Sequence, residues 1–134
     1  MRGMTDLFKL LSDVLRIRIL MILRRKELSV CQLMGIMGVS QPLVSRNLSL
    51  LYKGGFLEER REGKLRFYCL RKDIGKEKSE ILDFLQEHLK DNAVYQDDVK
   101  TLQECSEFQK KAGRCDMKTL QEFVEWKKKK RGNR

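Results

Sequence analysis

Residues 27–70 read ELSVCQLMGIMGVSQPLVSRNLSLLYKGGFLEERREGKLRFYCL, and this stretch decides the fold. Apolar side chains recur in its first part at steps of three and four residues, which predicts one buried face of a short helix. These residues are Leu28, Val30, Cys31, Leu33, Met34 and Met37. Gly38 follows directly and predicts the helix end, because glycine adopts the left-handed conformation common there at no steric cost.

A second helix is predicted to begin at about Gln41. Ser40 stands where a side-chain oxygen can cap free backbone amides, and Pro42 lies just inside the helix, where its missing N–H costs nothing. Gly54 and the glycine after it predict the helix end. The predicted core side comprises Leu43, Val44, Leu48, Leu50, Leu51 and Tyr52, and the predicted polar side comprises Gln41, Ser45, Arg46, Asn47 and Ser49. Polar side chains on the open face of such a helix can meet base edges in a DNA groove.

Two predicted strands follow this helix. They cover residues 56–61 and 65–70, and Glu62-Gly63 supplies a turn that glycine permits through its positive φ. Four cations gather near the turn, namely Arg60, Arg61, Lys64 and Arg66. Helix, tight turn, helix and basic hairpin in this order predict a mainly α fold with a small β-hairpin wing, an α+β arrangement suited to DNA.

The charge of the chain agrees with this prediction. Lys and Arg number 29 against 19 Asp and Glu, which leaves a net charge of +10. Up to residue 74 there are 15 basic and 7 acidic residues, and after it 14 and 12. The excess therefore lies on the proposed DNA-binding part, where a polyanion is the natural partner. Isolated basic residues are usually just solvated on a protein surface. The positive charge therefore indicates DNA binding only in combination with the two predicted helices.

The stretch resembles the ArsR/SmtB family of arsenical-resistance and metal-responsive repressors, over roughly residues 7–70. Residues 27–33, 40–48, 61–64 and 68–70 carry the resemblance. It implies a homodimeric winged helix-turn-helix repressor that binds double-stranded operator DNA of imperfect inverted-repeat sequence in the absence of ligand. The implied DNA contacts are Ser40, Gln41, Ser45, Arg46 and the wing cations Arg60, Arg61, Lys64 and Arg66, to which we add Asn47 from the same polar run.

The rest of the chain is predicted to be helical. A first helix runs from Thr5 or Asp6 to Leu11, and Asp13 caps a second helix. Residues 77–89 place Ile81, Leu82, Leu85 and Leu89 along one stripe. The stripe is either a dimer seam or an ordinary core face, and only the resemblance favours the seam.

Residues beyond the minimal family domain form a predicted extension. We expect helices over about residues 97–111 and 116–126, with a break at Gly113. We therefore divide the chain into a winged helix-turn-helix DNA-binding and dimerisation domain at 1–92, and a helical cysteine-containing C-terminal extension with a basic tail at 93–134. The cations at 127–131 are expected to be a solvated tail, with DNA-phosphate contact as the less favoured alternative.

Several function classes are disfavoured. We expect a cytoplasmic protein with reduced cysteines, because no secretory signal or membrane-length apolar run is present. A thiol enzyme is disfavoured because the sequence has no Cys-x-x-Cys, no glycine-rich phosphate cradle and no histidine besides His88. A winged domain that binds protein instead of DNA stays possible, since fold alone does not settle function.

The ligand site departs from the family pattern. Arsenic-responsive relatives often carry two cysteines one residue apart plus a third at the short helix, whereas here Ser29, Cys31 and Met34 occupy these positions. One thiolate cannot form the three-sulfur site that a soft trivalent ion prefers. His88 as the lone histidine also argues against a histidine-based zinc site. No cofactor is expected to be obligatory.

Two sensing hypotheses remain. In the first, Cys31, Cys105 and Cys115 are thiolate ligands of As(III) or another thiophilic metal ion, which acts as the inducer. In the second, Cys105 and Cys115 form a disulfide or polysulfide bridge and sense oxidants or sulfur species. A small buried hydrophobe is an equally good reading of Cys31. Cys69 alternates with Leu65 and Phe67 on a strand and is expected to be structural.

Overall fold

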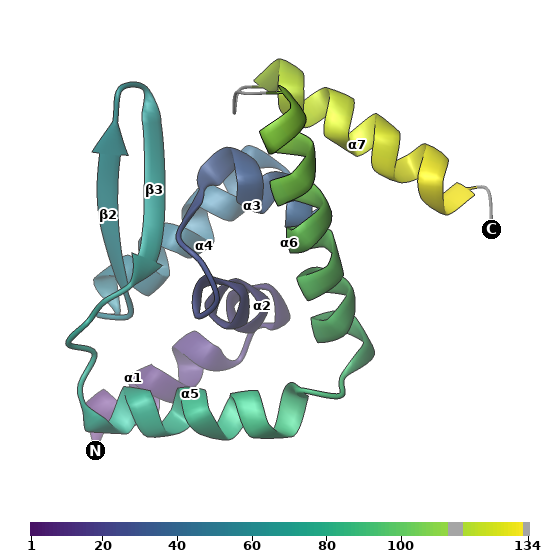
Figure 1. Ribbon diagram of the computed structural model, residues 1–134. Coiled ribbons are helices and arrows are strands. Elements are labelled where there is room, and N and C mark those ends of the chain that lie inside the picture. The colour runs from purple at the N-terminus through teal and green to yellow at the C-terminus, as the bar shows by residue number, and fades with distance from the viewer. Residues whose placement is uncertain (113–116, 133–134) are drawn as a thin grey trace.

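The computed structural model describes the backbone of residues 1–112 and 117–132, and the side chains of residues 1–108 and 121–130. The helices are α1 (Arg2–Leu11), α2 (Val14–Leu23), α3 (Val30–Met37), α4 (Gln41–Lys53), α5 (Lys76–Leu89), α6 (Ala93–Ala112) and α7 (Met117–Gly132), and the strands are β1 (Leu28–Ser29), β2 (Leu57–Glu62) and β3 (Leu65–Leu70). The predicted mainly α fold with a small β wing is confirmed (Figure 1). The predicted break at Gly113, with Cys115 and Asp116, lies outside the described residues.

The wing is an antiparallel sheet in the strand order β1-β3-β2. Strands β2 and β3 pair from Leu57 opposite Leu70 to Glu62 opposite Leu65. Gly63 has φ +60°, which is the left-handed conformation expected of this turn. The sequence did not predict β1, because two residues are too few to show an alternating pattern.

Local side-chain chemistry sets the helix starts. Asp13 caps α2, as predicted, by accepting a hydrogen bond from the Arg16 amide at 3.1 Å. The expected cap from Ser40 is wrong, because α4 has no side-chain cap hydrogen bond. A capping oxygen takes the second or third amide of a helix. In α4 the second residue is Pro42, which has no N–H to offer.

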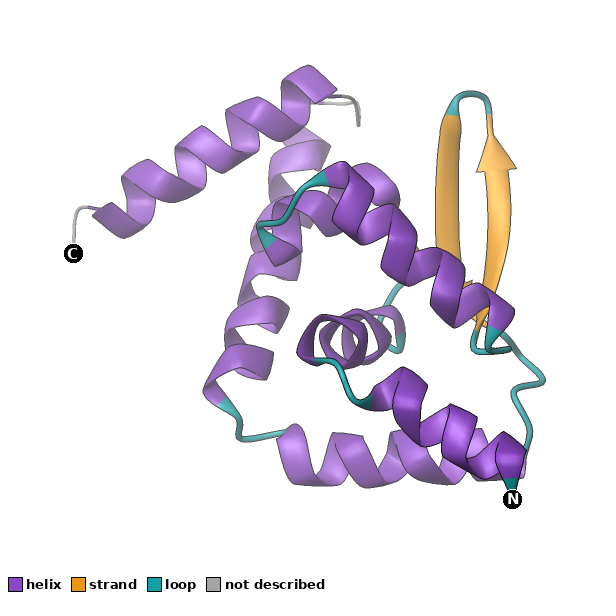
Figure 2. Ribbon diagram, turned by 180° about the vertical axis from the view of Figure 1, so that it is seen from behind, coloured by secondary structure: helices purple, strands orange, loops and turns teal. Residues whose placement is uncertain are grey.

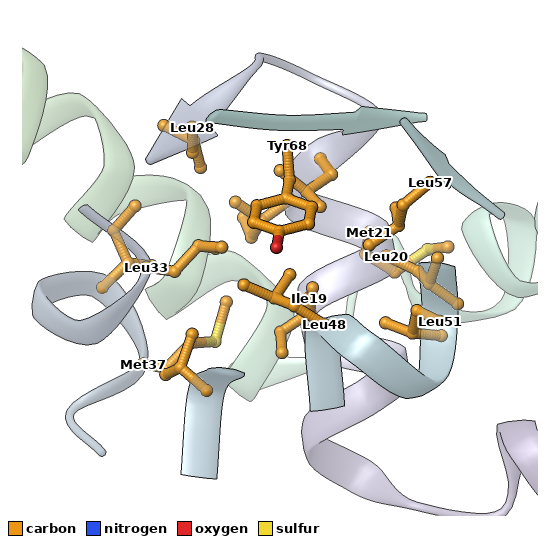
Figure 3. Packing of buried hydrophobic residues seen from close by; sticks show 14 of the residues in the cluster. Ile19, Leu20, Met21, Leu28, Leu33, Met37, Leu48, Leu51, Leu57 and Tyr68 are labelled. Atoms are coloured by element: carbon orange, nitrogen blue, oxygen red, sulfur yellow. The ribbon is translucent and has the colours of Figure 1, made fainter. Parts of the chain in front are cut away.

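The core surrounds α2, which lies at the centre of the molecule (Figures 1 and 2). Ile19, Leu20 and Ile22 are completely buried. Side chains from α3, α4 and β3 pack around them, as seen for Leu33, Leu48 and Tyr68 in Figure 3. The whole cluster comprises Leu11, Ile19, Leu20, Met21, Ile22, Leu23, Leu28, Leu33, Ile36, Met37, Val44, Leu48, Leu51, Phe56, Leu57, Tyr68, Leu82, Leu102, Cys105 and Phe123.

The C-terminal extension packs on the rest of the chain. Helix α6 packs against α2 and α3, and α7 packs against α3. Leu102, Cys105 and Phe123 belong to the same hydrophobic cluster as α2. Arg18 on α2 also donates two hydrogen bonds to the buried carboxylate of Asp98 on α6, at 2.9 and 2.8 Å. Among the described residues, the segment from 93 onward therefore completes the core of the domain it follows.

The predicted core side of α4 is partly wrong. Val44, Leu48 and Leu51 are completely buried, but Leu43 and Leu50 keep 42% and 37% of their surface exposed. The buried residues follow steps of four and three, so they form one narrow stripe, and the two exposed leucines lie beside it. Tyr52, also assigned to the core side, is 51% exposed.

Within the described residues, no helix combines the length and apolar character needed to cross a membrane.

Candidate nucleic-acid interface

A groove of about 770 Å³ lies between α4, the start of α3 and the wing. Its lining comprises Ser29, Val30, Cys31, Met34, Gln41, Ser45, Ser49, Tyr52, Glu59, Lys64, Leu65, Arg66 and Tyr68. Gln41, Ser45, Ser49 and Tyr52 come from α4 at steps of four, four and three, so one side of this helix faces the wing. Sequence reasoning missed Ser49 and Tyr52 as site residues, although the same spacing was available to find them.

The α4 residues predicted to contact DNA fall into two groups. Ser40, Gln41, Ser45 and Arg46 are exposed, and Gln41 and Ser45 line the groove. Arg46 follows Ser45 by one residue, which turns it about 100° around the helix, away from the groove lining. It therefore lies on the outer flank of α4, one helical turn before the exposed Leu50.

Asn47 was assigned to the polar open side, and that assignment is wrong. Its side chain is only 4% exposed. The Oδ1 atom accepts a hydrogen bond from Arg16 Nη1 at 3.0 Å, and Nδ2 donates to the Leu43 carbonyl at 2.9 Å. A buried polar side chain needs such partners, and Arg16 lies 31 residues earlier in the chain. Asn47 thus belongs to the support of α4.

One face of the wing carries Arg61 and Arg66 side by side, since the two are directly opposite in the β2–β3 pairing. Like charges in this position repel each other. Glu59 lies between them, with Oε1 at 3.3 Å from Arg61 Nε and 3.8 Å from Arg66 Nε. A single carboxylate offsets only one of the two charges, so the pair retains an attraction for a phosphate. Lys64 is exposed at the tip and has no carboxylate partner among the residues that the structure describes.

Arg60 has a different role from its neighbour. It is paired with Phe67 across the strands, which places it on the opposite face of the wing. Its guanidinium binds Glu27 at 2.6 Å and Glu62 at 2.9 Å, and lies 4.6 Å from the centre of the Phe67 ring. The hydrogen bond from Arg60 lowers the pKa of Glu27. Arg60 therefore ties β2 to the segment before β1, and its charge is neutralised by these two carboxylates.

The position on α3 that the resemblance assigns to a trivalent ion does not offer three thiolates in this chain. Ser29 forms a capping box with Gln32, in which Ser29 Oγ accepts from the Gln32 amide at 3.2 Å and Gln32 Oε1 accepts from the Ser29 amide at 2.8 Å. Cys31 is partly buried beside Met34 in the groove lining. The position therefore offers one thiolate, one thioether and a hydroxyl that starts a helix.

The other predicted ligands are separated or lie outside the described residues. Cys105 is 3% exposed within the core cluster, on a helix that packs against the helix of Cys31. Cys115 lies outside the described residues. Over the part of the chain that the structure describes, no three or more His, Cys, Asp or Glu side chains are grouped to hold a metal ion. His88 contacts the Phe84 ring, with the ring centres 4.3 Å apart.

Cys69 lies on the far face of the wing, opposite Glu58. Burial raises the pKa of its thiol, and the carboxylates of Glu27 and Glu58 raise it further. The thiolate is the reactive form of cysteine, so a raised pKa reduces its reactivity near neutral pH.

We expect iodoacetamide at pH 8 to alkylate Cys69 more slowly in the native protein than in the urea-unfolded chain, as measured by peptide mapping. Equal rates in both states would contradict this environment.

Figure 2 shows helices packed beside a two-stranded hairpin. With α3, a tight turn, an α4 whose polar side lines a groove, and cations on the hairpin, this arrangement defines a winged helix-turn-helix protein. The sequence model of the bacterial regulatory protein, arsR family, matches residues 13–59. The arsenical resistance operon repressor of Escherichia coli (strain K12) is 40% identical over 79 residues, which cover 58% of this chain and 68% of that protein. This chain belongs to the arsR family.

Two further relatives extend the comparison. The arsenic resistance transcriptional regulator ArsR2 of Pseudomonas putida (strain KT2440) is 43% identical over 70 residues, which cover 52% of this chain and 61% of that protein. The homodimeric winged helix-turn-helix DNA-binding domain (fragment 1–100) of Mb0332 from Mycobacterium bovis, a possible ArsR-family regulator, is 25% identical with a TM-score of 0.56. That match covers 69% of this chain and 82% of the solved fragment. The likeness to these proteins thus leaves a substantial part of this chain unmatched.

Proposed function

We propose that this chain is a homodimeric repressor that reads operator DNA with α4 and the wing, and releases it when a thiophilic ligand binds cysteine thiolates. The groove between α4 and the wing carries the proposal, because polar side chains line one wall and cations border the other. Gln41 and Ser45 would meet base edges, and Ser40, Arg61, Lys64 and Arg66 would hold phosphates. Arg46 would reach the DNA from the outer flank of α4.

An apolar surface on α1 and α5 supports the dimer. Phe8 is 58% exposed and Phe84 is 63% exposed. They border a hollow of about 540 Å³ lined by Phe8, Leu11, Ser12, Ile17, Glu80, Ile81, Phe84 and Leu85. An exposed apolar surface of this kind marks an interaction site. For two α4 helices to enter successive major grooves, a second copy docked here must hold them about one turn of duplex apart, roughly 34–36 Å.

The proposed inducer is an arsenite-like ion bound by Cys105 and Cys115, with Cys31 as third ligand. The names of the two curated relatives, both connected with arsenic resistance, support this choice. Cys105 is buried in the core cluster that includes residues of α3, so a ligand must disturb this packing to reach the thiol. Such a disturbance would be felt at α3 and α4. Coupling between two binding sites is typically about 1–3 kcal/mol, or roughly 5- to 150-fold in affinity.

A mobility assay tests this proposal. The probe is a duplex selected from a random pool by the wild-type protein, in the presence of sodium arsenite, zinc, cadmium or an oxidant. We expect arsenite to weaken wild-type binding by roughly 5- to 150-fold. The double variant Cys105→Ser with Cys115→Ser should keep its DNA affinity and lose this response. The matched control Cys69→Ser should respond like wild type. A full arsenite response in the double serine variant would eliminate the C-terminal sensor.

Thiol counting separates the ion from the redox alternative. About three thiolates lost per bound ion support a trivalent site. Loss of only Cys105 and Cys115 on oxidation without metal supports a disulfide or polysulfide switch in the same extension. If the protein binds all duplexes equally well, or if its binding does not weaken as salt rises, sequence-specific DNA binding is contradicted.

A further inference from the structure

Arg16, at the start of α2, joins three parts of the structure. Its Nε donates to the Leu10 carbonyl at 2.5 Å and its Nη2 lies 3.5 Å from the Lys9 carbonyl. Both carbonyls belong to the last turn of α1, where the partial negative charge of a helix end favours a cation. Nη1 donates to Asn47 Oδ1 on α4 at 3.0 Å. One guanidinium, with only 17% of the side chain exposed, therefore links α1 to α4.

Helix α1 also contacts the end of α4 directly. Gly54 follows the last residue of α4, and the Leu10 side chain lies so close to it that an added Cβ would collide with it. Asn47 lies two helical turns before Gly54. Contacts at two separated points fix the direction of one helix relative to another, whereas a single contact leaves it free to pivot.

We infer that Arg16 and Asn47 are positioning residues that set the angle of α4 relative to α1, and thereby the spacing of half-sites that the dimer accepts. The inference rests on the proposed DNA binding and on the proposed α1–α5 dimer surface. Phe8 lies on α1 in that surface, and Asn47 lies on the buried side of the helix that carries Ser45. The Arg16–Asn47 contact is thus a direct link from the dimer surface to the reading helix.

The chain offers a matched control in a second arginine of α2. Arg18 binds Asp98 on α6 with two hydrogen bonds, and Asp98 is 1% exposed. Both hydrogen bonds of this pair run between α2 and α6, so the pair holds α6 in place. Loss of either arginine contact is expected to destabilise the fold, because a buried polar group loses its partner. Only loss of the Arg16–Asn47 contact is expected to change the spacing preference.

The test compares Asn47→Leu, Asn47→Asp and Asp98→Asn with wild type. Leu removes the acceptor for Arg16, whereas Asp keeps an oxygen in its place. The probes are the wild-type-selected duplex and versions with one or two base pairs inserted or deleted between its half-sites. The readout is the ratio of Kd on altered spacing to Kd on selected spacing. Partial unfolding lowers the active fraction for both duplexes equally, so it leaves this ratio unchanged.

Half-site spacing mirrors the geometry of the dimer, so we expect each inserted or deleted base pair to weaken wild-type binding at least as much as one mismatched base pair does, about fivefold. In Asn47→Leu the ratio should fall by about threefold or more, and Asn47→Asp and Asp98→Asn should keep the wild-type ratio. Arg16→Gln replaces Asn47→Leu in the comparison if the latter does not fold. If Asn47→Leu or Arg16→Gln has the same Kd ratio as wild type, the inference is overturned, but the proposed DNA binding still stands. A wild-type protein that selects no duplex overturns DNA binding, and the inference with it.

Discussion

Replacing Arg61 and Arg66 together with glutamine should weaken binding to every duplex and flatten its salt dependence. The two guanidinium groups lie on the groove face of the wing and share a single carboxylate, that of Glu59. Each phosphate contact contributes about 0.9 to the slope of log K against log salt. Loss of two contacts per protomer therefore lowers the slope of a dimer by about 3 to 4. A fourfold rise in salt should then weaken the wild type about 100-fold more than the variant.

Arg60→Gln is the matched control for this experiment. Arg60 carries the same charge on the neighbouring residue, but it faces the other side of the wing and binds Glu27 and Glu62. We expect its salt slope to equal that of wild type, as measured by fluorescence anisotropy on a selected and a scrambled duplex. Equal loss of slope in Arg60→Gln and in the double variant would show that the wing acts only through net charge. Loss confined to the selected duplex would instead assign base reading to Arg61 and Arg66.

Leu48→Ala should lower the free energy of unfolding by about 2–5 kcal/mol. Leu48 is completely buried on α4 and packs toward Ile19 and Tyr68 in the core around α2 (Figure 3). Truncation removes apolar contacts and leaves a cavity that the surrounding helices fill only in part. Because the small size of the chain leaves little stability in reserve, such a loss should strongly reduce the folded fraction at raised temperature.

Leu50→Ala is the control on the same helix. The Leu50 side chain is 37% exposed, so we expect a change in the free energy of unfolding below about 1 kcal/mol. Urea unfolding followed by circular dichroism gives both values, at one fixed protomer concentration because dimerisation stabilises by mass action. Equal destabilisation by the two substitutions would contradict the orientation of α4.

Much of the fold could be predicted because its signals are local. Gly38, at φ +69°, ends α3 as expected, and Asp13 caps α2. The Ser-x-x-Gln pattern at Ser29 was equally local and would have placed the start of α3 at Val30, because a capping box is readable from sequence. Strand β1 was beyond reach, since it exists only through pairing with β3. The extent of α6, which begins at Ala93, was underestimated although Asn92 caps it, with Oδ1 accepting hydrogen bonds from the Val94 amide at 2.9 Å and the Tyr95 amide at 3.2 Å.

The site was predictable in kind but less so in detail. The alternation of a strand already separates Arg60 from Arg61, yet only the β2–β3 register and the position of α4 show which of them faces the groove. Asn47 is polar and stood among polar neighbours, so its burial could not be foreseen without Arg16. Helical spacing alone likewise could not show that Leu50 falls beside the buried stripe, because its width depends on what packs against α4.

Because translation runs from the N-terminus, α6 and α7 leave the ribosome after α3, the helix on which they pack. A nascent chain that has emerged as far as α5 already contains α3, α4 and the wing, but α3 still lacks both helices that cover it. Leu102, Cys105 and Phe123 join the core only later in synthesis. Until then the apolar side chains that these residues cover stay open to water and to chaperones. The time needed to synthesise α6 and α7 therefore sets a lower limit on how long this surface stays uncovered.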